Sequence, residues 1–270
     1  MIMLWFFACR ELPEAPLELG ELGRFLFDRF DDDDSAELEA GLTNLVVRLR
    51  AEDFTLDAAD RAVAMPVLGP EVLGALSLPE GTTSEDQVGV AVSGVSTFPL
   101  EEQRRLVVDP VQTCVESAAT TWAGRTFDSD PDCFFASCDR LVTGNAVRRE
   151  SLLARVWYDQ PKIYRAFTLE GDDVDVVLGR AHIDRVFESD GGGNAWRQLF
   201  QLDAFVRDGD RTLRWFASWT EIEVLGLSDD LLANLVVSGV EEALQFGDEI
   251  LAGGESRCPH DRDAPMPTRP

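Results

Sequence analysis

Histidine and lysine are scarce in this chain. Its 270 residues include two histidines, His182 and His260, and a single lysine, Lys162; all other basic residues are arginines. Two histidines cannot build a multi-histidine metal centre, and a His-dependent triad would have to use one of them. His182 alternates with Arg180 and Asp184 along a strand-like segment, so we expect it on a polar, solvent-facing surface.

Positive charge is also in short supply. There are 50 Asp and Glu residues against 24 Lys and Arg residues, which gives a formal net charge of −26. Such a surface repels nucleic-acid backbones and anionic lipid headgroups, so we expect no nucleic-acid partner. A hydrophobic fraction of 45% still suffices for a folded core, and the acidic surface is typical of a solvated exterior.

Signature motifs of catalysis are absent from the sequence. We find no G-x-S-x-G elbow, P-loop, H-E-x-x-H or G-x-G-x-x-G motif. The run Gly191–Asn194 joins two strand-like segments and reads as a hairpin turn rather than a phosphate cradle. The sequence therefore gives no catalytic residue, no metal and no cofactor; it leaves the enzyme question open and favours a non-catalytic role.

The N-terminus is apolar from Met1 to Ala8, and Cys9 follows. This run is too short to cross a bilayer as a helix. Phe6-Phe7-Ala8-Cys9 resembles the lipobox of bacterial lipoproteins, although both phenylalanines are bulky and no basic residue precedes them. The resemblance implies a lipid on Cys9 and a membrane-anchored protein at the periplasmic face of the envelope, or a secreted one. The alternative is a buried first strand or helix in a cytoplasmic protein.

The remaining cysteines form an even set, which an oxidising compartment could pair in three ways. Cys133 and Cys138 are close enough in sequence for a local disulfide, and Cys114 with Cys258 would then tie the C-terminal tail to the middle of the chain. The alternative is four reduced thiols, with Cys114 a small core residue.

The loop DSDPDCFFASCD is also an acidic-loop candidate for calcium. Cys133 stands where an EF-hand loop needs glycine, and Pro131 restricts the turn, so we expect an acidic loop closed by a disulfide instead. The residues at the acidic-loop spacing are Asp128, Asp130, Asp132 and Asp139.

Composition and periodicity divide the chain into four parts. They are an apolar leader and tether (1–20), an N-terminal helical segment (21–86), an α+β domain (87–253) and a disordered tail (254–270). We expect a helical hairpin in the second part, with Asp34 and Glu37 starting its second helix, and a short helix over 99–108. A long final helix should begin after the N-cap Ser228 and stop at Gly253.

Four β-rich segments after residue 150 predict an antiparallel meander with one buried face. Pro161 places its segment at a sheet edge or a bulge. On the second segment the buried face should hold Val177, Gly179, Ala181, Ile183 and Phe187. On the third segment it should hold Trp196, Phe200, Leu202, Ala204 and Val206. On the fourth it should hold Leu213, Trp215, Ala217 and Trp219.

The fold class is therefore α+β: an N-terminal helical hairpin, then an antiparallel meander packed on a long C-terminal helix. This order is similar to the helix-grip arrangement of START-like lipid- and polyketide-binding domains. That resemblance implies a cavity between the sheet and the final helix. Its walls would include Trp157, Phe200, Trp215, Trp219 and Phe246; the alternative is that these aromatics are simply core.

Three functional hypotheses remain open. The first is an envelope-anchored or secreted non-catalytic domain that binds a small apolar ligand or a protein partner. The second is a START-like carrier or enzyme with an internal cavity. The third is a structural acidic protein of a salt-adapted cell.

Overall fold

The computed structural model describes residues 14–32, 35–74, 82–115, 117, 119–150, 155–169, 173–183, 185–190, 192–224, 227–253, 257–262 and 264–268. Cys9 and the rest of the apolar leader lie outside these ranges, as do Asp34 and Asp184. In the described part of the chain, no helix is both long and apolar enough to span a membrane.

The chain alternates short helices with long strands. The helices are α1 (Leu19–Asp28), α2 (Ser35–Arg50), the 3₁₀ turn η1 (Ala58–Arg61), α3 (Pro70–Gly74), α4 (Leu100–Val107), α5 (Pro131–Ala136) and α6 (Asp229–Leu251). The strands are β1 (Val63–Met65), β2 (Val88–Ser96), β3 (Thr120–Phe127), β4 (Arg140–Glu150), β5 (Arg155–Leu169), β6 (Val174–His182), β7 (Phe187–Glu188), β8 (Ala195–Asp208) and β9 (Arg211–Glu223).

Within the described residues the strands form one nine-stranded antiparallel sheet. Its order is β1-β2-β9-β8-β6-β5-β4-β3, with β7 paired to β8. The four predicted segments are β5, β6, β8 and β9, and the sheet is wider because β1 to β4 extend it on both sides. The α+β class with an antiparallel sheet and a C-terminal helix is therefore confirmed.

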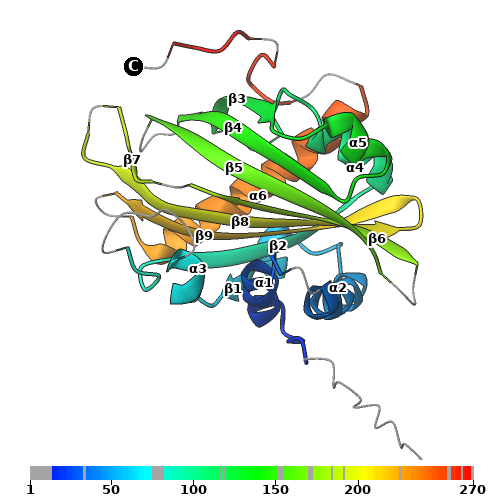
Figure 1. Cartoon of the computed structure of the whole chain (residues 1–270). Helices are drawn as coiled ribbons and strands as arrows, with labels where there is room; N and C mark the ends of the chain where they lie inside the picture. Colours follow the sequence, from blue (N-terminus) through cyan, green and yellow to red (C-terminus); the bar gives the residue numbers. More distant parts are fainter. Residues whose placement is uncertain are drawn as a thin grey trace, which may run out of the picture.

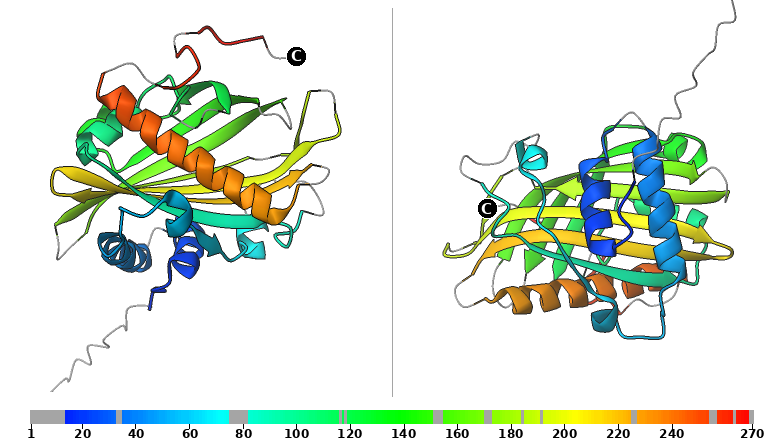
Figure 2. Two further views of the ribbon diagram at one scale, coloured as in Figure 1. Left: turned by 180° about the vertical axis from the view of Figure 1, so that it is seen from behind. Right: turned by 90° about the horizontal axis from the view of Figure 1, so that it is seen from below.

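Helices cover both faces of this sheet (Figures 1 and 2). Helices α1 and α2 lie across one face, and α6 runs diagonally across the other. We call these the α1/α2 face and the α6 face. The expectation of a single buried sheet face was wrong, because alternate residues of the same strands meet a helical layer on either side.

The final helix follows its sequence signals. Ser228 caps it, since its hydroxyl accepts a hydrogen bond from the Leu231 amide at 3.3 Å. Gly253, with φ of 68°, follows the last turn in the left-handed region that favours glycine. Helix α4 likewise begins directly after Pro99.

Strand β5 lies inside the sheet, between β4 and β6, so the edge position inferred from Pro161 was wrong for the strand as a whole. The reason is local. Pro161 pairs with Gly144 of β4, but the pairing of β5 with β6 begins only at Lys162. Pro161 has no backbone N–H to donate, but it lies beyond the residues of β5 that pair with β6, so the ladder between these two strands loses no hydrogen bond.

Candidate functional site

The predicted aromatic face exists, but it packs against the N-terminal helices. The Phe27 ring of α1 meets the rings of Phe200 and Trp219 with centroids 5.8 and 5.3 Å apart. Trp215 extends to Gly23, where an added Cβ would lie 2.6 Å from its Cη2. These four aromatics are at most 2% exposed and belong to one core cluster. They anchor α1 to the sheet, away from α6.

A cavity of about 930 Å³ does lie on the α6 face. Among the five aromatics expected to line it, Trp215 borders it, while Phe200 and Trp219 point to the opposite face. Trp157 instead lies beside Trp122, at 6.0 Å between ring centroids, and Phe246 is buried further along α6. Of the five expected wall residues, only Trp215 is therefore among those that border the cavity.

The roof of the cavity is apolar and comes from α6. It continues onto the end of the sheet through Trp196 and Ile222. The roof residues include Leu231, Leu232, Leu235, Val236, Val240 and Leu244. Leu231 and Leu235 are each 48% exposed, so the apolar lining reaches the protein surface near the start of α6.

Trp196 reaches the cavity because of a β-bulge. The register between β8 and β9 shifts between Trp196 and Gln198, so one extra residue is inserted on β8. Trp196 therefore opposes Ile222 and shares the α6 face with it, whereas Phe200 opposes Trp219 on the other face. The prediction that Trp196 and Phe200 share one face was wrong for this reason.

The floor of the cavity is polar and buried. On the sheet, the polar residues that border the cavity at 7% exposure or less are Lys162, Gln201, Asp203, Arg214, Ser218 and Thr220. Buried polar residues on the same face of the neighbouring strands, beside the cavity, are Arg125, Thr143, Asn145 and Gln160. They alternate along β3, β4, β5, β8 and β9 with residues of the opposite face. Buried polar groups are costly unless they are hydrogen-bonded, and several of these side chains bond to one another; Gln160, for example, donates to Gln201 at 2.8 Å.

The centre of the floor holds an ion pair between Lys162 and Asp203. Their side chains are only 6% and 10% exposed. The Lys162 ammonium also lies 5.2 Å from the centre of the Tyr164 ring. Arg125 also lies near that ring and donates hydrogen bonds to the Tyr164 hydroxyl at 3.1 Å and to Asn145 Oδ1 at 2.8 Å. The cavity thus offers a ligand both charged and neutral hydrogen-bonding groups.

A second ion pair, between buried Arg214 and half-buried Asp248, lies near the C-terminal end of α6. Arg214 of β9 donates to the Asp248 carboxylate at 3.0 Å, and Ser96 donates to the same carboxylate at 2.6 Å. Burial lowers the pKa of the Arg214 guanidinium, and the contact with Asp248 opposes that effect. This pair fixes the end of α6 to the sheet.

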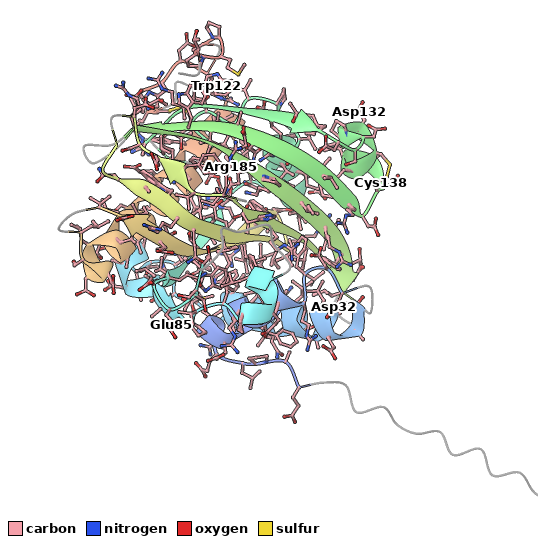
Figure 3. All side chains as sticks on the ribbon, turned by 60° about the vertical axis from the view of Figure 1, so that its left-hand side comes forward. Asp32, Glu85, Trp122, Asp132, Cys138 and Arg185 are labelled. Atoms are coloured by element: carbon pink, nitrogen blue, oxygen red, sulfur yellow. A yellow bond between two sulfur atoms is a disulfide. The ribbon has the colours of Figure 1, made fainter. Side chains whose placement is uncertain are left out.

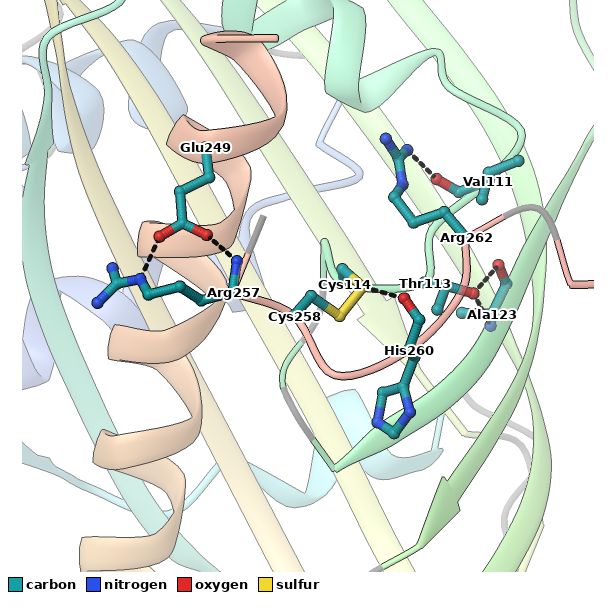
Figure 4. The surroundings of a disulfide bond; sticks show 9 residues. All are labelled: Val111, Thr113, Cys114, Ala123, Glu249, Arg257, Cys258, His260 and Arg262. Atoms are coloured by element: carbon teal, nitrogen blue, oxygen red, sulfur yellow. Dashed lines mark hydrogen bonds and ion pairs between the residues drawn. A yellow bond between two sulfur atoms is a disulfide. The ribbon is translucent and has the colours of Figure 1, made fainter. Parts of the chain in front are cut away.

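A disulfide between Cys114 and Cys258 closes the neighbouring side of the site (Figure 4). Its Cα atoms are 5.6 Å apart, within the usual range for a disulfide. The linked loop contributes Val115 and Ser117 to the cavity wall. In the described part of the tail, Arg262 donates to the Asp109 carboxylate at 2.7 Å, so the tail is fastened by more than the sulfur bridge.

The acidic loop contains the second predicted disulfide, between Cys133 and Cys138, with Cα atoms 5.2 Å apart; Asp132 and Cys138 mark this loop in Figure 3. Asp130, one of the calcium candidates, caps α5 by accepting a hydrogen bond from the Asp132 amide at 2.9 Å. Across the ranges that the structure describes, no three His, Cys, Asp or Glu side chains are grouped so as to hold a metal ion.

The part of β6 that contains Arg180 and His182 does not form the solvated polar face that we expected. Arg180 is 11% exposed and stacks over the Phe30 ring at 4.6 Å, where it also pairs with Asp31. His182 ends β6, opposite Phe200, and is half-buried. Even-numbered residues of β6 therefore contribute to the core beneath α1 and α2.

Comparisons with known proteins add only distant structural likenesses. No family model and no curated protein matches the chain. A STAR-related lipid transfer protein fragment from Xanthomonas axonopodis is 10% identical, with a TM-score of 0.43 over 64% of this chain and 89% of that one. The Zhui aromatase/cyclase from Streptomyces sp. R1128 is 10% identical, with a TM-score of 0.37 over 63% and 99%. A START superfamily protein from Mycobacterium smegmatis is 11% identical, with a TM-score of 0.35 over 61% and 97%.

Proposed function

We propose that this protein binds a small amphipathic molecule between the α6 face of the sheet and α6, as a START-like helix-grip domain would. The cavity of about 930 Å³ is the observation that carries this proposal. Its volume is in the range of pockets for drug-sized ligands. The apolar ligand expected from the sequence becomes an amphipathic one, because an apolar roof faces a polar floor.

Gly239 offers a way to fill the cavity without disturbing the sheet. It lies in α6 on the cavity wall, and an added Cβ would meet the Ser117 Cβ at an ordinary 3.7 Å. A leucine there favours the helix and extends into the ligand space. We expect Gly239→Leu to weaken binding of the fluorescent probe N-phenyl-1-naphthylamine at least about tenfold, or about 1.4 kcal/mol.

The matched control is Asn234→Leu, which adds the same side chain to α6 at an exposed position away from the cavity. It should bind the probe like the unmodified protein. Native mass spectrometry of the purified protein should also show a co-purified small molecule that Gly239→Leu loses. Equal probe binding by both variants would contradict the proposal and favour a purely structural acidic protein.

We further propose that the protein acts outside the cytoplasm, as a lipoprotein anchored through Cys9 or as a secreted protein. The two disulfides support this, because such bonds persist mainly in oxidising compartments. Alkylation without reduction should leave four cysteines unlabelled, and mass spectrometry of membrane fractions should find lipid on Cys9. Five alkylated thiols in a soluble fraction would contradict this localisation.

A further inference from the structure

The cavity floor contains the one lysine of the protein. Lys162 is the single lysine among 24 Lys and Arg residues, and it is 5% exposed. Every other cationic position in the chain holds arginine. Lys162 is therefore the one position at which this chain carries its positive charge on a lysine rather than on an arginine.

The larger size of the arginine side chain does not explain why lysine occupies this position. Lys162 borders a cavity of about 930 Å³, so a guanidinium would have room there. The two side chains differ in chemistry instead: a guanidinium stays protonated in proteins, whereas a lysine amine can lose its proton and attack a carbonyl carbon. A buried lysine beside open ligand space thus has a capacity that no arginine of this chain has.

The surroundings of Lys162 suit a covalent adduct. Its ion pair with Asp203 is almost completely removed from solvent. Such a pair is a weak source of stability, because desolvation offsets most of the attraction. Its place on a ligand cavity therefore points to recognition or chemistry.

We propose that Lys162 forms an imine with an aldehyde or ketone ligand held in the cavity. This inference rests on the proposed ligand-binding function and specifies the ligand class: an apolar molecule that carries a carbonyl group. The apolar roof from α6 would cover the body of the ligand, and the carbonyl carbon would meet the amine at the floor.

The reaction needs no oxidant or reductant. The Lys162 ammonium transfers a proton to the Asp203 carboxylate, and the free amine adds to the carbonyl carbon. A proton then moves from the nitrogen to the former carbonyl oxygen, which gives a neutral carbinolamine, and Asp203 returns its proton to the hydroxyl group as that group leaves as water. The loss of water leaves a protonated imine. One ammonium and one carbonyl group thus give one iminium ion and one water molecule, so the charge beside Asp203 is unchanged.

This conservation of charge gives Asp203 the same role before and after the reaction. Its carboxylate stabilises the ammonium in the free protein and the iminium in the adduct. The Tyr164 ring, 5.2 Å from the Lys162 nitrogen, faces a cation in both states.

Because the chain contains a single lysine, an adduct on a lysine side chain can be assigned to Lys162. We would incubate the purified full-length protein with decanal and sodium cyanoborohydride, which reduces an imine to a stable amine. The expected result is the added mass of one decyl group, mapped by peptide mass spectrometry to Lys162 and formed at least about tenfold faster than on the N-terminal amine. Decanol, which has no carbonyl group, should bind without leaving an adduct.

Two variants separate the proposals. Lys162→Arg keeps the positive charge and should fold, as circular dichroism would verify, yet lose the adduct; Gly239→Leu should slow adduct formation by closing the cavity. If Lys162 reacts no faster than the N-terminal amine while naphthylamine binding remains sensitive to Gly239→Leu, the imine proposal is overturned and the binding function stands. If the probe does not bind at all, both proposals fail.

Discussion

The two faces of the sheet are made from alternate residues of the same strands, yet they differ in polarity and in packing. On β9 the α1/α2 face is apolar, and the α6 face is largely polar. The residues on the first face are Leu213, Trp215, Ala217 and Trp219, and the polar ones on the second are Arg214, Ser218 and Thr220. Both sets are buried. The first face is close-packed, whereas the second encloses a cavity of about 930 Å³.

This difference teaches that alternation along a strand does not by itself report which face meets water. Polar residues usually mark the solvent side of an antiparallel sheet. Here α6 and the Cys114–Cys258 loop cover them, so the polar face becomes the floor of an enclosed site. One face holds the fold together, and the other leaves room for a ligand.

The largest expected effect compares neighbours on β8 that point to opposite faces. Phe200 is fully buried against Phe27, so Phe200→Ala should lower the free energy of unfolding by about 3–5 kcal/mol. Leu199 borders the cavity, where fewer packed contacts can be lost, so Leu199→Ala should cost about 2 kcal/mol. Urea unfolding followed by tryptophan fluorescence measures both, and a larger loss for Leu199→Ala would reverse the comparison.

The next comparison makes the same substitution, glycine to alanine, in both helical layers. We expect smaller changes in stability than for Phe200→Ala, and changes of opposite sign in the two layers. At Gly23 of α1, a Cβ would lie 2.6 Å from Cη2 of Trp215, so Gly23→Ala should destabilise the protein by about 1–3 kcal/mol through overpacking. At Gly239 of α6 the nearest atom is 3.7 Å away, so Gly239→Ala should stabilise it by about 0.5–1 kcal/mol. Thermal unfolding of both variants tests this, and equal shifts in Tm would show that the two layers are packed alike.

The smallest effect concerns a charge at the margin of the α1/α2 layer. Burial raises the pKa of Asp28 from 3.8 to about 6; Glu71 adds to the rise, and Arg24 and Arg29 oppose it. Within the described residues, its buried Oδ1 accepts no hydrogen bond. The folded protein therefore binds the proton of the Asp28 carboxyl group more tightly than the unfolded chain does. The stability that this difference contributes is present below pH 3.8 and is lost as the pH rises through 6.

Asp28→Asn removes this dependence. The variant should match the unmodified protein near pH 4 and exceed its free energy of unfolding by about 1 kcal/mol at pH 7, a figure reduced for the partial exposure of the side chain. Urea unfolding at the two pH values gives the difference. A difference that is the same at both values would mean that the Asp28 carboxylate is not desolvated.

Much of the fold could be predicted from local signals. The cap at Ser228, the stop at Gly253 and the turns between β5, β6, β8 and β9 depend on neighbouring residues and short-range geometry. Strands β3 and β4 were missed, because their alternation places polar residues such as Thr143 and Asn145 at buried positions. Those positions are buried only because α6 and the adjoining loops cover this face of the sheet.

The site could be predicted only in outline. The sequence indicated a cavity beneath the final helix, but Phe200 and Trp219, two of the aromatics chosen for its walls, point to the opposite face of the sheet. One signal was available: α1, α2 and α6 each carry an apolar stripe, and a single apolar sheet face cannot cover them all. The bulge at Trp196 gives no comparable signal, because its consequence depends on the partner strand.

The sequence by itself determined the strands β5, β6, β8 and β9, the cap and the stop of α6, the alternation of two unlike faces along these strands and the uniqueness of Lys162, since all of these follow from residue type and spacing. Only the tertiary structure decided which helices cover which face, that the polar face is enclosed, and that Lys162 meets Asp203 inside a cavity. Those outcomes depend on contacts between residues far apart in the chain, which periodicity within a single segment cannot encode.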